Sequence, residues 1–341
     1  MAQTALVTGG TGYIGGELID QLLAAGWDVR TTVRSKVKSE GRLRARWPDA
    51  GGRLRVFEAD LTDDAGWAEA NAGCSHVAHV ASPFPMAIPK HADELIMPAR
   101  EGTLRALRFA HEAGVRRFVQ TSSAAAIAYG HAPQRTHFDE SDWTNLDGPD
   151  AEPYIQSKTI AERAARDWVA ANAPGMVFCS VNPVVVFGPV ENDDLSTSVE
   201  VLKRLVDGGM PLIPHFGIGV VDVRDVARIH RFALEAPDEM VRGERFAASN
   251  GFMWVEEMAT ILRERIPDRA RKVPARRMPG FMVAILAAFM PEMRQVKRSV
   301  GRVREVSGRH ACEVFGFEYI PAADTLVDTV ASLFDKGIVK A

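Results

Sequence analysis

The stretch Thr4-Ala5-Leu6-Val7-Thr8-Gly9-Gly10-Thr11-Gly12-Tyr13-Ile14-Gly15 decides the fold. A short apolar strand leads into a glycine-rich turn and then into an amphipathic helix expected over residues 13–25. Glycines at such a turn let backbone N–H groups and the helix N-terminus approach a pyrophosphate, although a plain strand-to-helix turn needs them too. The stretch predicts a dinucleotide site, with these contact residues: Gly9, Thr11, Gly12, Tyr13, Ile14 and Gly15.

The first half of the chain alternates short apolar runs with helical patterns. The further strands are expected at residues 29–33, 54–58, 76–80, 117–121 and 176–181, and the further helices at residues 94–112 and 153–171. Such alternation indicates βαβ units and a parallel sheet, and therefore an α/β fold of the Rossmann type, a doubly wound parallel sheet.

The second half is irregular and richer in glycine and proline. Helices are expected there at residues 197–206, 224–235, 255–264 and 323–335. We expect residues 1–185 to form the nucleotide-binding Rossmann domain, with returning segments near 215–250. Residues 186–341 would mainly form a smaller substrate-binding lobe that is interleaved with it.

The bulk composition argues against several classes of function. The 341 residues carry a formal net charge of −3, so no basic field points to nucleic acid or to an anionic membrane. The three cysteines have no CxxC spacing, so neither a metal site nor a disulfide is expected. The longest apolar run, residues 281–289, is shorter than the ~20 residues that span a bilayer, and predicts a buried or interface helix.

The start of the chain and its apolar runs give expectations for where the protein is found and what it binds. The first strand begins almost at Met1, so no signal peptide is expected and the cytoplasm is the expected location. As partners we expect a small molecule, no nucleic acid and no membrane, with the protein a monomer or homodimer.

The end of the second expected strand bears on the choice of dinucleotide. NAD sites usually carry Asp or Glu there, to bind the ribose 2′-hydroxyl. This chain has Arg34, with Lys38 one helical turn later. Arginine binds a phosphate with two parallel hydrogen bonds, whereas a carboxylate would repel it. The pair favours NADP (NADPH), although two cations in a basic surface stretch would look the same.

The ends of the other expected strands supply further candidate cofactor contacts. Asp60 would accept a hydrogen bond from the adenine amino group, or would simply be a helix N-cap. Ligands of open α/β sheets bind at the carboxyl ends of strands. The remaining candidates lie at or just after such ends: Leu61, Val80, Ala81, Thr121 and Pro183.

Tyr154 and Lys158 lie four residues apart on an expected helix and therefore share one face. A free tyrosine has a pKa of ~10, too high for ready acid–base catalysis near neutrality. Lys158 is expected to lower that value and to bind the nicotinamide ribose. Tyr154 would then protonate a carbonyl oxygen, and a serine from Ser122-Ser123 would hydrogen-bond the same oxygen.

Five motifs, in this order along the chain, resemble those of the extended short-chain dehydrogenases/reductases: TGGTGYIG (8–15), HVASP (79–83), TSSA (121–124), YIQSK (154–158) and VNPVVVFGP (181–189). Residues 29–34 and 221–226 are similar to the dihydroflavonol reductase-like branch, which includes aldehyde and ketone reductases. The resemblance implies Ser123, which precedes the alanine, as the catalytic serine. It implies Tyr154 as the acid, Lys158 as its partner, and Arg34 and Lys38 as the 2′-phosphate pair.

The chain also departs from that branch. Dihydroflavonol reductases carry Asn or Asp five positions after the serine, where this chain has Ala128, so an apolar or aromatic carbonyl compound is expected instead. The proton-relaying Asn of related reductases has no match in residues 98–107. Pocket candidates near strand ends or in later loops are Phe84, Met86, Ile127, Phe187, His215 and Phe216.

The expected activity is NADPH-dependent, reversible reduction of an aldehyde or ketone to an alcohol. Two alternatives remain at this point. One is a nucleotide-sugar epimerase or dehydratase, which usually has an acid where Arg34 stands. The other is a non-catalytic NADP-sensing protein, which often lacks the tyrosine.

Overall fold

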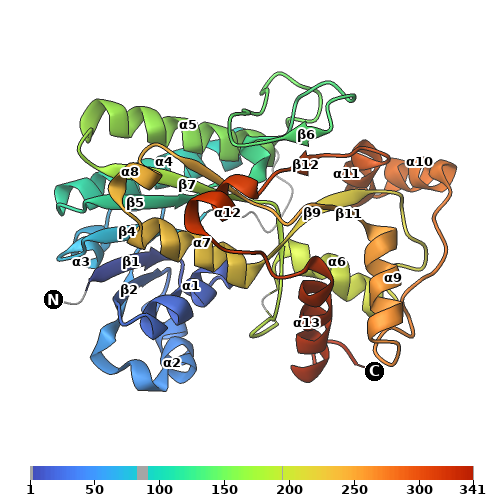
Figure 1. Cartoon of the computed structure of the whole chain (residues 1–341), viewed down its shortest axis with the longest axis horizontal. Coiled ribbons are helices and arrows are strands. Elements are labelled where there is room, and N and C mark those ends of the chain that lie inside the picture. Colours follow the sequence, from blue (N-terminus) through green and yellow to red (C-terminus); the bar gives the residue numbers. More distant parts are fainter. Residues whose placement is uncertain (1–2, 83–90, 194, 341) are drawn as a thin grey trace.

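The centre of the protein is a seven-stranded parallel sheet with the order β10-β7-β5-β4-β1-β2-β3 (Figure 1). The computed structural model describes residues 3–82, 91–193 and 195–340. The strands are β1 (Thr4–Thr8), β2 (Asp28–Val33), β3 (Leu54–Glu58), β4 (His76–His79), β5 (Arg117–Thr121), β7 (Val177–Pro183) and β10 (Arg245–Ala248). This sheet confirms the Rossmann-type fold. The strand order reverses between β1 and β4, where such sheets form their ligand crevice.

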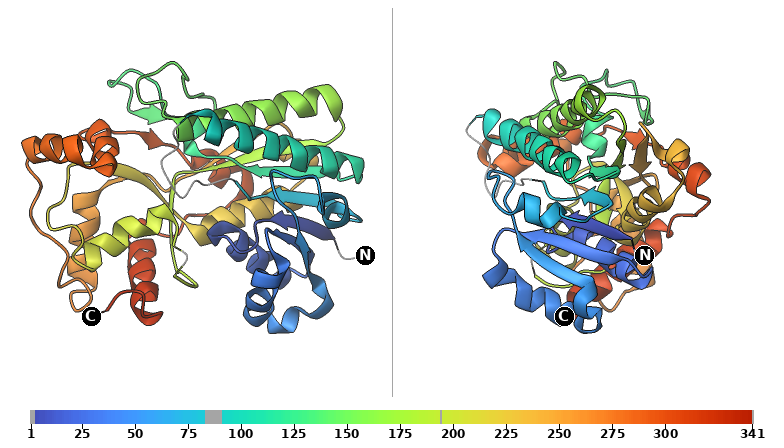
Figure 2. Two further views of the ribbon diagram at one scale, coloured as in Figure 1. Left: turned by 180° about the vertical axis from the view of Figure 1, so that it is seen from behind. Right: turned by 90° about the vertical axis from the view of Figure 1, so that its left-hand side faces the viewer.

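Helices cover both faces of this sheet (Figures 1 and 2). On one face α1 (Tyr13–Ala24) packs against α7 (Val223–Glu235), and on the other α4 (Asp93–Glu112) packs against α5 (Pro153–Asn172). The apolar stripes of these helices meet buried strand residues, for example Leu18 and Ile229 on one side and Leu107 on the other. Shorter elements flank the sheet: α2 (Lys36–Arg46), η1 (Pro48–Arg53), α3 (Trp67–Asn71), η2 (Ala124–Ala126) and α8 (Asp238–Val241).

A second, smaller lobe surrounds a three-stranded sheet with the order β11-β9-β8. Its strands are β8 (Val185–Phe187), β9 (Gly217–Asp222) and β11 (Phe252–Trp254). The apolar faces of α6 (Thr197–Val206), α9 (Val255–Arg265) and α13 (Ala322–Asp335) form one buried cluster with this sheet. The remaining elements are β6 (His137–Phe138), β12 (Glu305–Val306), α10 (Gly280–Phe289), α11 (Pro291–Ser299) and α12 (Arg309–Phe315).

The expected strands at 29–33 and 176–181 begin one residue away from their predicted starts, and two strands end at a residue other than the predicted one. The fourth strand ends at His79, one residue early, and the sixth continues to Pro183 instead of ending at Val181. The extension occurs because β10 pairs with residues 180–183 of β7. That pairing joins segments about sixty residues apart, so no local pattern reveals it, and β10 itself was not expected.

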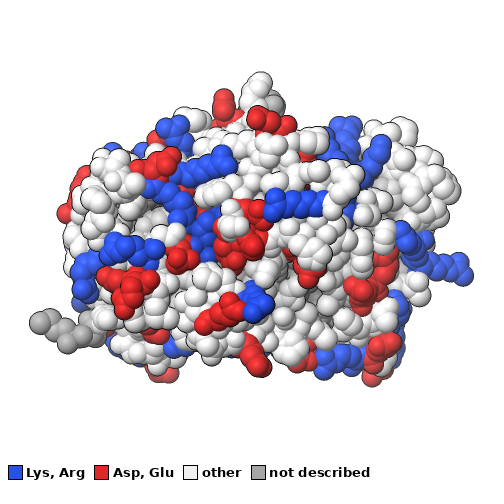
Figure 3. All heavy atoms as spheres, turned by 45° about the horizontal axis from the view of Figure 1, so that its top comes forward, with Lys and Arg blue, Asp and Glu red and all other residues white. Residues whose placement is uncertain are grey.

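The expectation of a buried or interface helix at residues 281–289 is wrong as to burial. On α10 the side chains of Phe281, Ile285 and Phe289 are 66%, 55% and 81% exposed, while Val283 and Ala287 are buried. The helix lies at the outer end of the smaller lobe, so only a narrow stripe meets other atoms (Figure 1). Figure 3 shows an uncharged surface at this end, and elsewhere on that face both charge signs interspersed.

Within the described part of the chain, no helix is both long enough and apolar enough to cross a membrane.

Candidate active site

The glycine-rich turn brings the N-terminus of α1 very close to the end of β1. Gly9 has a φ of +71°, and its carbonyl accepts a hydrogen bond from the Gly12 N–H at 2.9 Å. A Cβ added at Gly15 would lie 2.4 Å from the Gly9 oxygen, and one added at Gly9 would lie 3.2 Å from Ala81. The turn is therefore a cradle that side chains would fill, as a site for a pyrophosphate requires.

The other residues of this turn point in different directions. Thr11 and Gly12 line a cavity of about 50 Å³, together with smaller-lobe residues such as Val190. Tyr13 lines the same cavity and also packs against both large apolar clusters, whereas Ile14 packs against the cluster of the main sheet. Ile14 therefore presents only its backbone to a pyrophosphate.

Arg34 and Lys38 lie where the sequence predicts a 2′-phosphate contact. Arg34 follows the last residue of β2, Lys38 is in the first turn of α2, and both side chains are exposed. Arg34 is close enough to Asp60 to contribute to the lowered pKa of that carboxyl, although hydrogen bonds from Thr62 contribute more. The end of β2 thus presents a cation beside the expected adenine contact.

Asp60 does not cap a helix, so that alternative is wrong. Its Oδ1 accepts hydrogen bonds from the Thr62 N–H (2.8 Å) and hydroxyl (2.6 Å), which form a turn, and α3 begins only at Trp67. Leu61 packs against α4, since a Cβ added at Gly102 would lie 2.9 Å from the Leu61 Cβ.

The end of β4 lies against the end of β1. The Ala81 N–H donates to the Thr8 hydroxyl at 2.9 Å, and Val80 and Ala81 are both half-buried. Both residues therefore lie beside the glycine-rich turn, at the carboxyl edge of the sheet where the strand order reverses.

Tyr154, Lys158 and Ser123 come together at the same edge. Tyr154 and Lys158 occupy the first turns of α5, and the Lys158 ammonium lies 5.8 Å from the centre of the Tyr154 ring. The hydroxyl of Ser123, which follows β5, hydrogen-bonds the Tyr154 side chain. Its Oγ also accepts from the Ala125 N–H at 3.1 Å, which fixes the serine at the start of η2.

The expected lowering of the Tyr154 pKa is wrong for this structure. Although Tyr154 is 36% exposed, the protein atoms around its phenol desolvate it and raise its pKa above 10.0, and the hydrogen bond with Ser123 opposes that effect only in part. Lys158 is not among the groups that shift the Tyr154 pKa; its ammonium lies over the ring and donates to the Ser82 hydroxyl at 2.8 Å. Burial lowers the pKa of Lys158 itself to about 8.

Ser122 lies in a different, buried environment. Its hydroxyl donates to Glu162 Oε2 at 2.6 Å, and the Asn182 side-chain amide donates to the same oxygen at 2.7 Å. Arg245 donates to Glu162 Oε1 at 2.7 Å. Burial raises the pKa of Glu162, but Arg245, Arg166 and Ser122 outweigh burial, and the net pKa is lowered.

Sequence reasoning missed Glu162, although a signal for it existed. Glu162 follows Lys158 by four residues and Tyr154 by eight, which places all three on one face of α5. A glutamate at such a helical position is usually exposed, so its burial was not evident from the chain alone.

Two expected cofactor contacts have side chains that are engaged within the fold. The Thr121 hydroxyl lies 2.7 Å from His230 Nε2, and His230 Nδ1 lies 2.8 Å from the Val226 carbonyl. Pro183 is buried as the last residue of β7, and its carbonyl accepts from Ser123 Oγ at 3.5 Å. The Thr121 hydroxyl therefore offers a dinucleotide acceptor lone pairs, since its hydrogen bond with His230 uses its proton.

The residues predicted to line a substrate pocket differ in how deeply they are buried. Phe84 and Met86 lie outside the described residues. Ile127 and Phe187 are fully buried in apolar clusters, so they are core residues and not pocket residues. Phe216 is only partly buried, against the smaller-lobe cluster.

His215 is held by its neighbours. Its Nδ1 lies 2.9 Å from Glu256 Oε1, and its ring stacks on Trp254 at 4.2 Å between centroids.

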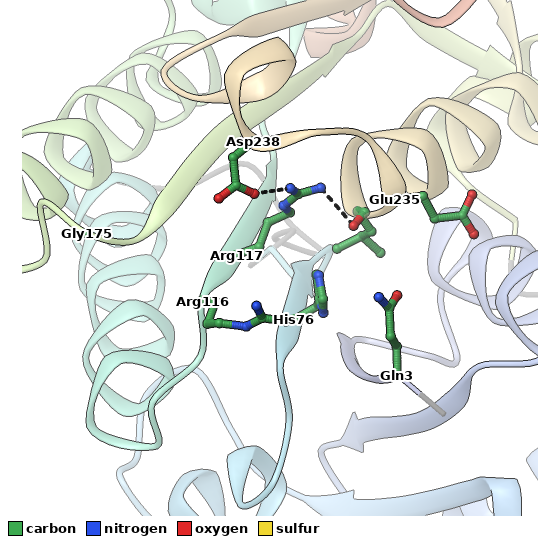
Figure 4. Close-up of a pocket in the computed structure, with 8 residues that line it drawn as sticks. Gln3, His76, Arg116, Arg117, Gly175, Glu235 and Asp238 are labelled. Atoms are coloured by element: carbon green, nitrogen blue, oxygen red, sulfur yellow. Dashed lines mark hydrogen bonds and ion pairs between the residues drawn. The ribbon is translucent and has the colours of Figure 1, made fainter. Parts of the chain in front are cut away.

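A larger cavity, of about 260 Å³, lies at the opposite edge of the sheet (Figure 4). Gln3, His76 and Arg117 line it, from the amino-terminal ends of β1, β4 and β5. Arg117 donates to the Leu234 carbonyl at 2.8 Å and pairs with Asp238, so it anchors the end of α7. Since open α/β sheets bind ligands at carboxyl ends, this cavity is not the expected site.

No group of three or more His, Cys, Asp or Glu side chains in the described ranges is arranged to hold a metal ion. The three cysteines are unpaired, and Cys74 and Cys179 are buried.

Comparison with known proteins identifies the family of this chain. The model of the NAD dependent epimerase/dehydratase family matches residues 5–248. Dihydroflavonol 4-reductase of Zea mays is 29% identical over 98% of this chain and 90% of its own length. Cinnamoyl-CoA reductase CAD2 of Medicago truncatula is 32% identical over 98% of this chain and 97% of its own length.

A solved structure is similar over nearly the whole chain. Gre2 of Candida albicans, in complex with NADPH, has a TM-score of 0.79 and 26% identity, over 98% of this chain and 99% of that one. The family model matches most of the chain, and the reductases align with it almost from end to end. Together these matches establish the family of the protein. The chain belongs to the NAD dependent epimerase/dehydratase family, the extended short-chain dehydrogenases/reductases, in its dihydroflavonol reductase-like branch.

Proposed function

We propose that the protein is an NADPH-dependent reductase that converts an aldehyde or ketone into an alcohol, reversibly. The observation that carries the proposal is the meeting of Tyr154, Lys158 and Ser123 at the carboxyl edge of the sheet. Relatives named as reductases align over nearly the whole chain, and Gre2 was crystallised with NADPH. These matches support reduction of a carbonyl group in general.

The residues present fit NADPH. The cradle at Gly9 and Gly15 admits a pyrophosphate beside the N-terminus of α1, whose dipole favours an anion. Arg34 and Lys38 offer two exposed cations to a 2′-phosphate, and Arg34 occupies the position that carries an acid in NAD sites. Glu58, at the end of the neighbouring strand β3, accepts from the Lys36 N–H at 2.7 Å. Asp60 would accept from the adenine amino group.

The bound nicotinamide supplies the hydride. Ser123 would donate a hydrogen bond to the substrate carbonyl oxygen and hold it beside the Tyr154 hydroxyl. A tyrosine whose pKa is raised stays protonated at neutral pH, and a protonated phenol is the state needed to donate a proton during reduction. Lys158 would hold the ribose hydroxyls and return a proton to the phenolate afterwards.

The substrate we propose is an apolar or aromatic carbonyl compound. Ala128 is 3% exposed and has no polar side-chain atom, so it offers nothing to the ring hydroxyls of a flavonoid. Phe216, Trp254 and the stacked His215 belong to the lobe expected to take the substrate.

A panel of carbonyl compounds tests the proposal, with oxidation of NADPH and NADH followed by absorbance. The panel contains aryl aldehydes, α-diketones, β-keto esters, a dihydroflavonol and a nucleotide sugar. Turnover of aryl aldehydes or diketones with a higher kcat/KM for NADPH supports the proposal. Preference for NADH, or conversion of the nucleotide sugar alone, contradicts it.

A further inference from the structure

We propose that Ser82 is a positioning residue for Lys158, which holds the lysine ammonium at the end of β4 and passes protons between it and solvent. Ser82 follows β4 by three residues, and its hydroxyl lies 2.8 Å from Lys158 Nζ. The proposal rests on the proposed function, because it assigns Ser82 to the proton path of the same reduction.

Ser82 lies in a stretch of chain that its neighbours keep in place. The preceding residue, Ala81, donates its N–H to the Thr8 hydroxyl at 2.9 Å and lies against Gly9. This arrangement holds the start of the loop after β4 to the end of β1. The serine hydroxyl thus faces α5 from the carboxyl edge of the sheet.

The Lys158 ammonium has enough N–H donors to hydrogen-bond Ser82 as well as the cofactor. A lysine ammonium has three N–H donors and no acceptor. In the proposed function two of them serve the ribose hydroxyls, which leaves one for Ser82. A hydroxyl both accepts and donates hydrogen bonds, so it can take a proton from water on one side as it gives one up on the other.

The protons given up and taken up during the reduction balance along this path. Tyr154 gives its phenolic proton to the carbonyl oxygen, and the phenolate regains one from the Lys158 ammonium. The resulting amine regains a proton from the Ser82 hydroxyl, which takes one from water. Ser82 is half-buried, so part of the residue is accessible to solvent. Each turnover therefore consumes one solvent proton and leaves all three side chains as they began.

Among residues 3–82, 91–193 and 195–340, the titratable groups that interact with the ammonium are Tyr154, on α5, and His79, on β4. His79 is neutral, because burial, and to a lesser extent Lys158, lowers its pKa to about 3. The shift of Lys158 itself is due to burial, so the charged side chains of α4, which packs against α5, take no part in it. The Ser82 oxygen is an uncharged acceptor for the ammonium, at 2.8 Å.

The test compares Ser82→Ala with Ser82→Thr, which keeps the hydroxyl. Ser75→Ala, at the other end of β4, controls for loss of a serine hydroxyl near the same strand. We expect Ser82→Ala to lower kcat about tenfold or more, as for a lost hydrogen bond to a charged group. The basic limb of the kcat/KM profile should move down by about one pH unit. Ser82→Thr should recover most of both effects, and Ser75→Ala should show neither.

A second readout needs no cofactor. The protein is labelled with lysine enriched in 13C at the ε carbon, the Lys158 signal is assigned with Lys158→Arg, and its pKa is followed by NMR. Ser82→Ala should lower that pKa. An unchanged Lys158 pKa, an unmoved pH profile or an equal loss in the threonine variant would overturn the proposal. Tyr154→Phe, assayed in parallel, separates this outcome from failure of the proposed function: full activity there refutes the reduction mechanism, while the NMR titration still reports on Ser82.

Discussion

The Ser122 hydroxyl donates to a buried carboxylate oxygen of Glu162 at 2.6 Å, and this contact separates two neighbouring serines. Ser122 points into the protein, while Ser123 points to the Tyr154 phenol. Because consecutive residues in an extended chain face opposite sides, only one of the two can lie at the site.

Replacing each serine in turn by alanine should therefore have different effects. We expect Ser123→Ala to lower kcat about 100-fold, as for a lost donor to a developing oxyanion, and to lower the free energy of unfolding by about 0.5–2 kcal/mol, because Ser123 also caps η2. Ser122→Ala should instead lower the free energy of unfolding by about 1–3 kcal/mol, because it removes one of the donors to a buried carboxylate. Steady-state kinetics and urea unfolding measure the two effects. A larger loss of kcat at Ser122 would refute the assignment of Ser123.

Removal of the Tyr154 hydroxyl should abolish turnover and spare cofactor binding. Tyr154→Phe keeps the ring beside the Lys158 ammonium and removes the proton donor, so we expect kcat to fall at least about 100-fold. NADPH affinity, measured by fluorescence titration, should stay near that of the wild type. Wild-type turnover in this variant would contradict the proposed mechanism.

The dinucleotide preference should depend on Arg34. We expect Arg34→Ala to raise the KM for NADPH about tenfold or more, and to leave the KM for NADH nearly unchanged, because only NADPH carries the 2′-phosphate. Lys36→Ala is the matched control, since Lys36 is an exposed cation on α2 that pairs with Glu40. The same loss in both variants would mean that general charge is responsible.

Glu162 should matter for stability, and in a pH-dependent way. Glu162→Ala leaves Arg245 in a buried position without its carboxylate, so we expect a loss of about 3–5 kcal/mol in the free energy of unfolding. Asp167→Ala, an exposed acid on the same helix, should change it by less than about 0.5 kcal/mol. Urea unfolding of both variants, each compared with the wild type, tests the difference.

The lowered pKa of Glu162 determines the direction of the pH effect. Because the pKa is lower in the folded than in the unfolded state, the contribution of Glu162 is present at neutral pH and is lost as pH falls through the folded pKa. In acid, the difference in stability between wild type and Glu162→Ala should therefore narrow. A difference that stays constant with pH would contradict this account.

The sequence by itself determined the parts of the fold and site that depend on local pattern. The period of apolar residues predicted the bounds of α1, α5 and α6 nearly to the residue, because the buried face of a helix recurs every three or four positions along the chain. The glycines of the first turn and the spacing of Tyr154 and Lys158 are local in the same way. These features sufficed for the Rossmann-type fold, which the structure confirms.

Only the tertiary structure decided what depends on contacts between distant segments. β10 joins β7 across the smaller lobe, and the apolar run of α10 proved to be mostly exposed. The tertiary structure also showed that burial raises the Tyr154 pKa, that Glu162 accepts a hydrogen bond from Ser122, and that Lys158 donates one to Ser82. The physical reason is that burial and hydrogen-bond partners are properties of the packed chain. The sequence shows that a residue is a glutamate or a lysine, but it does not show whether water or protein surrounds the charged group.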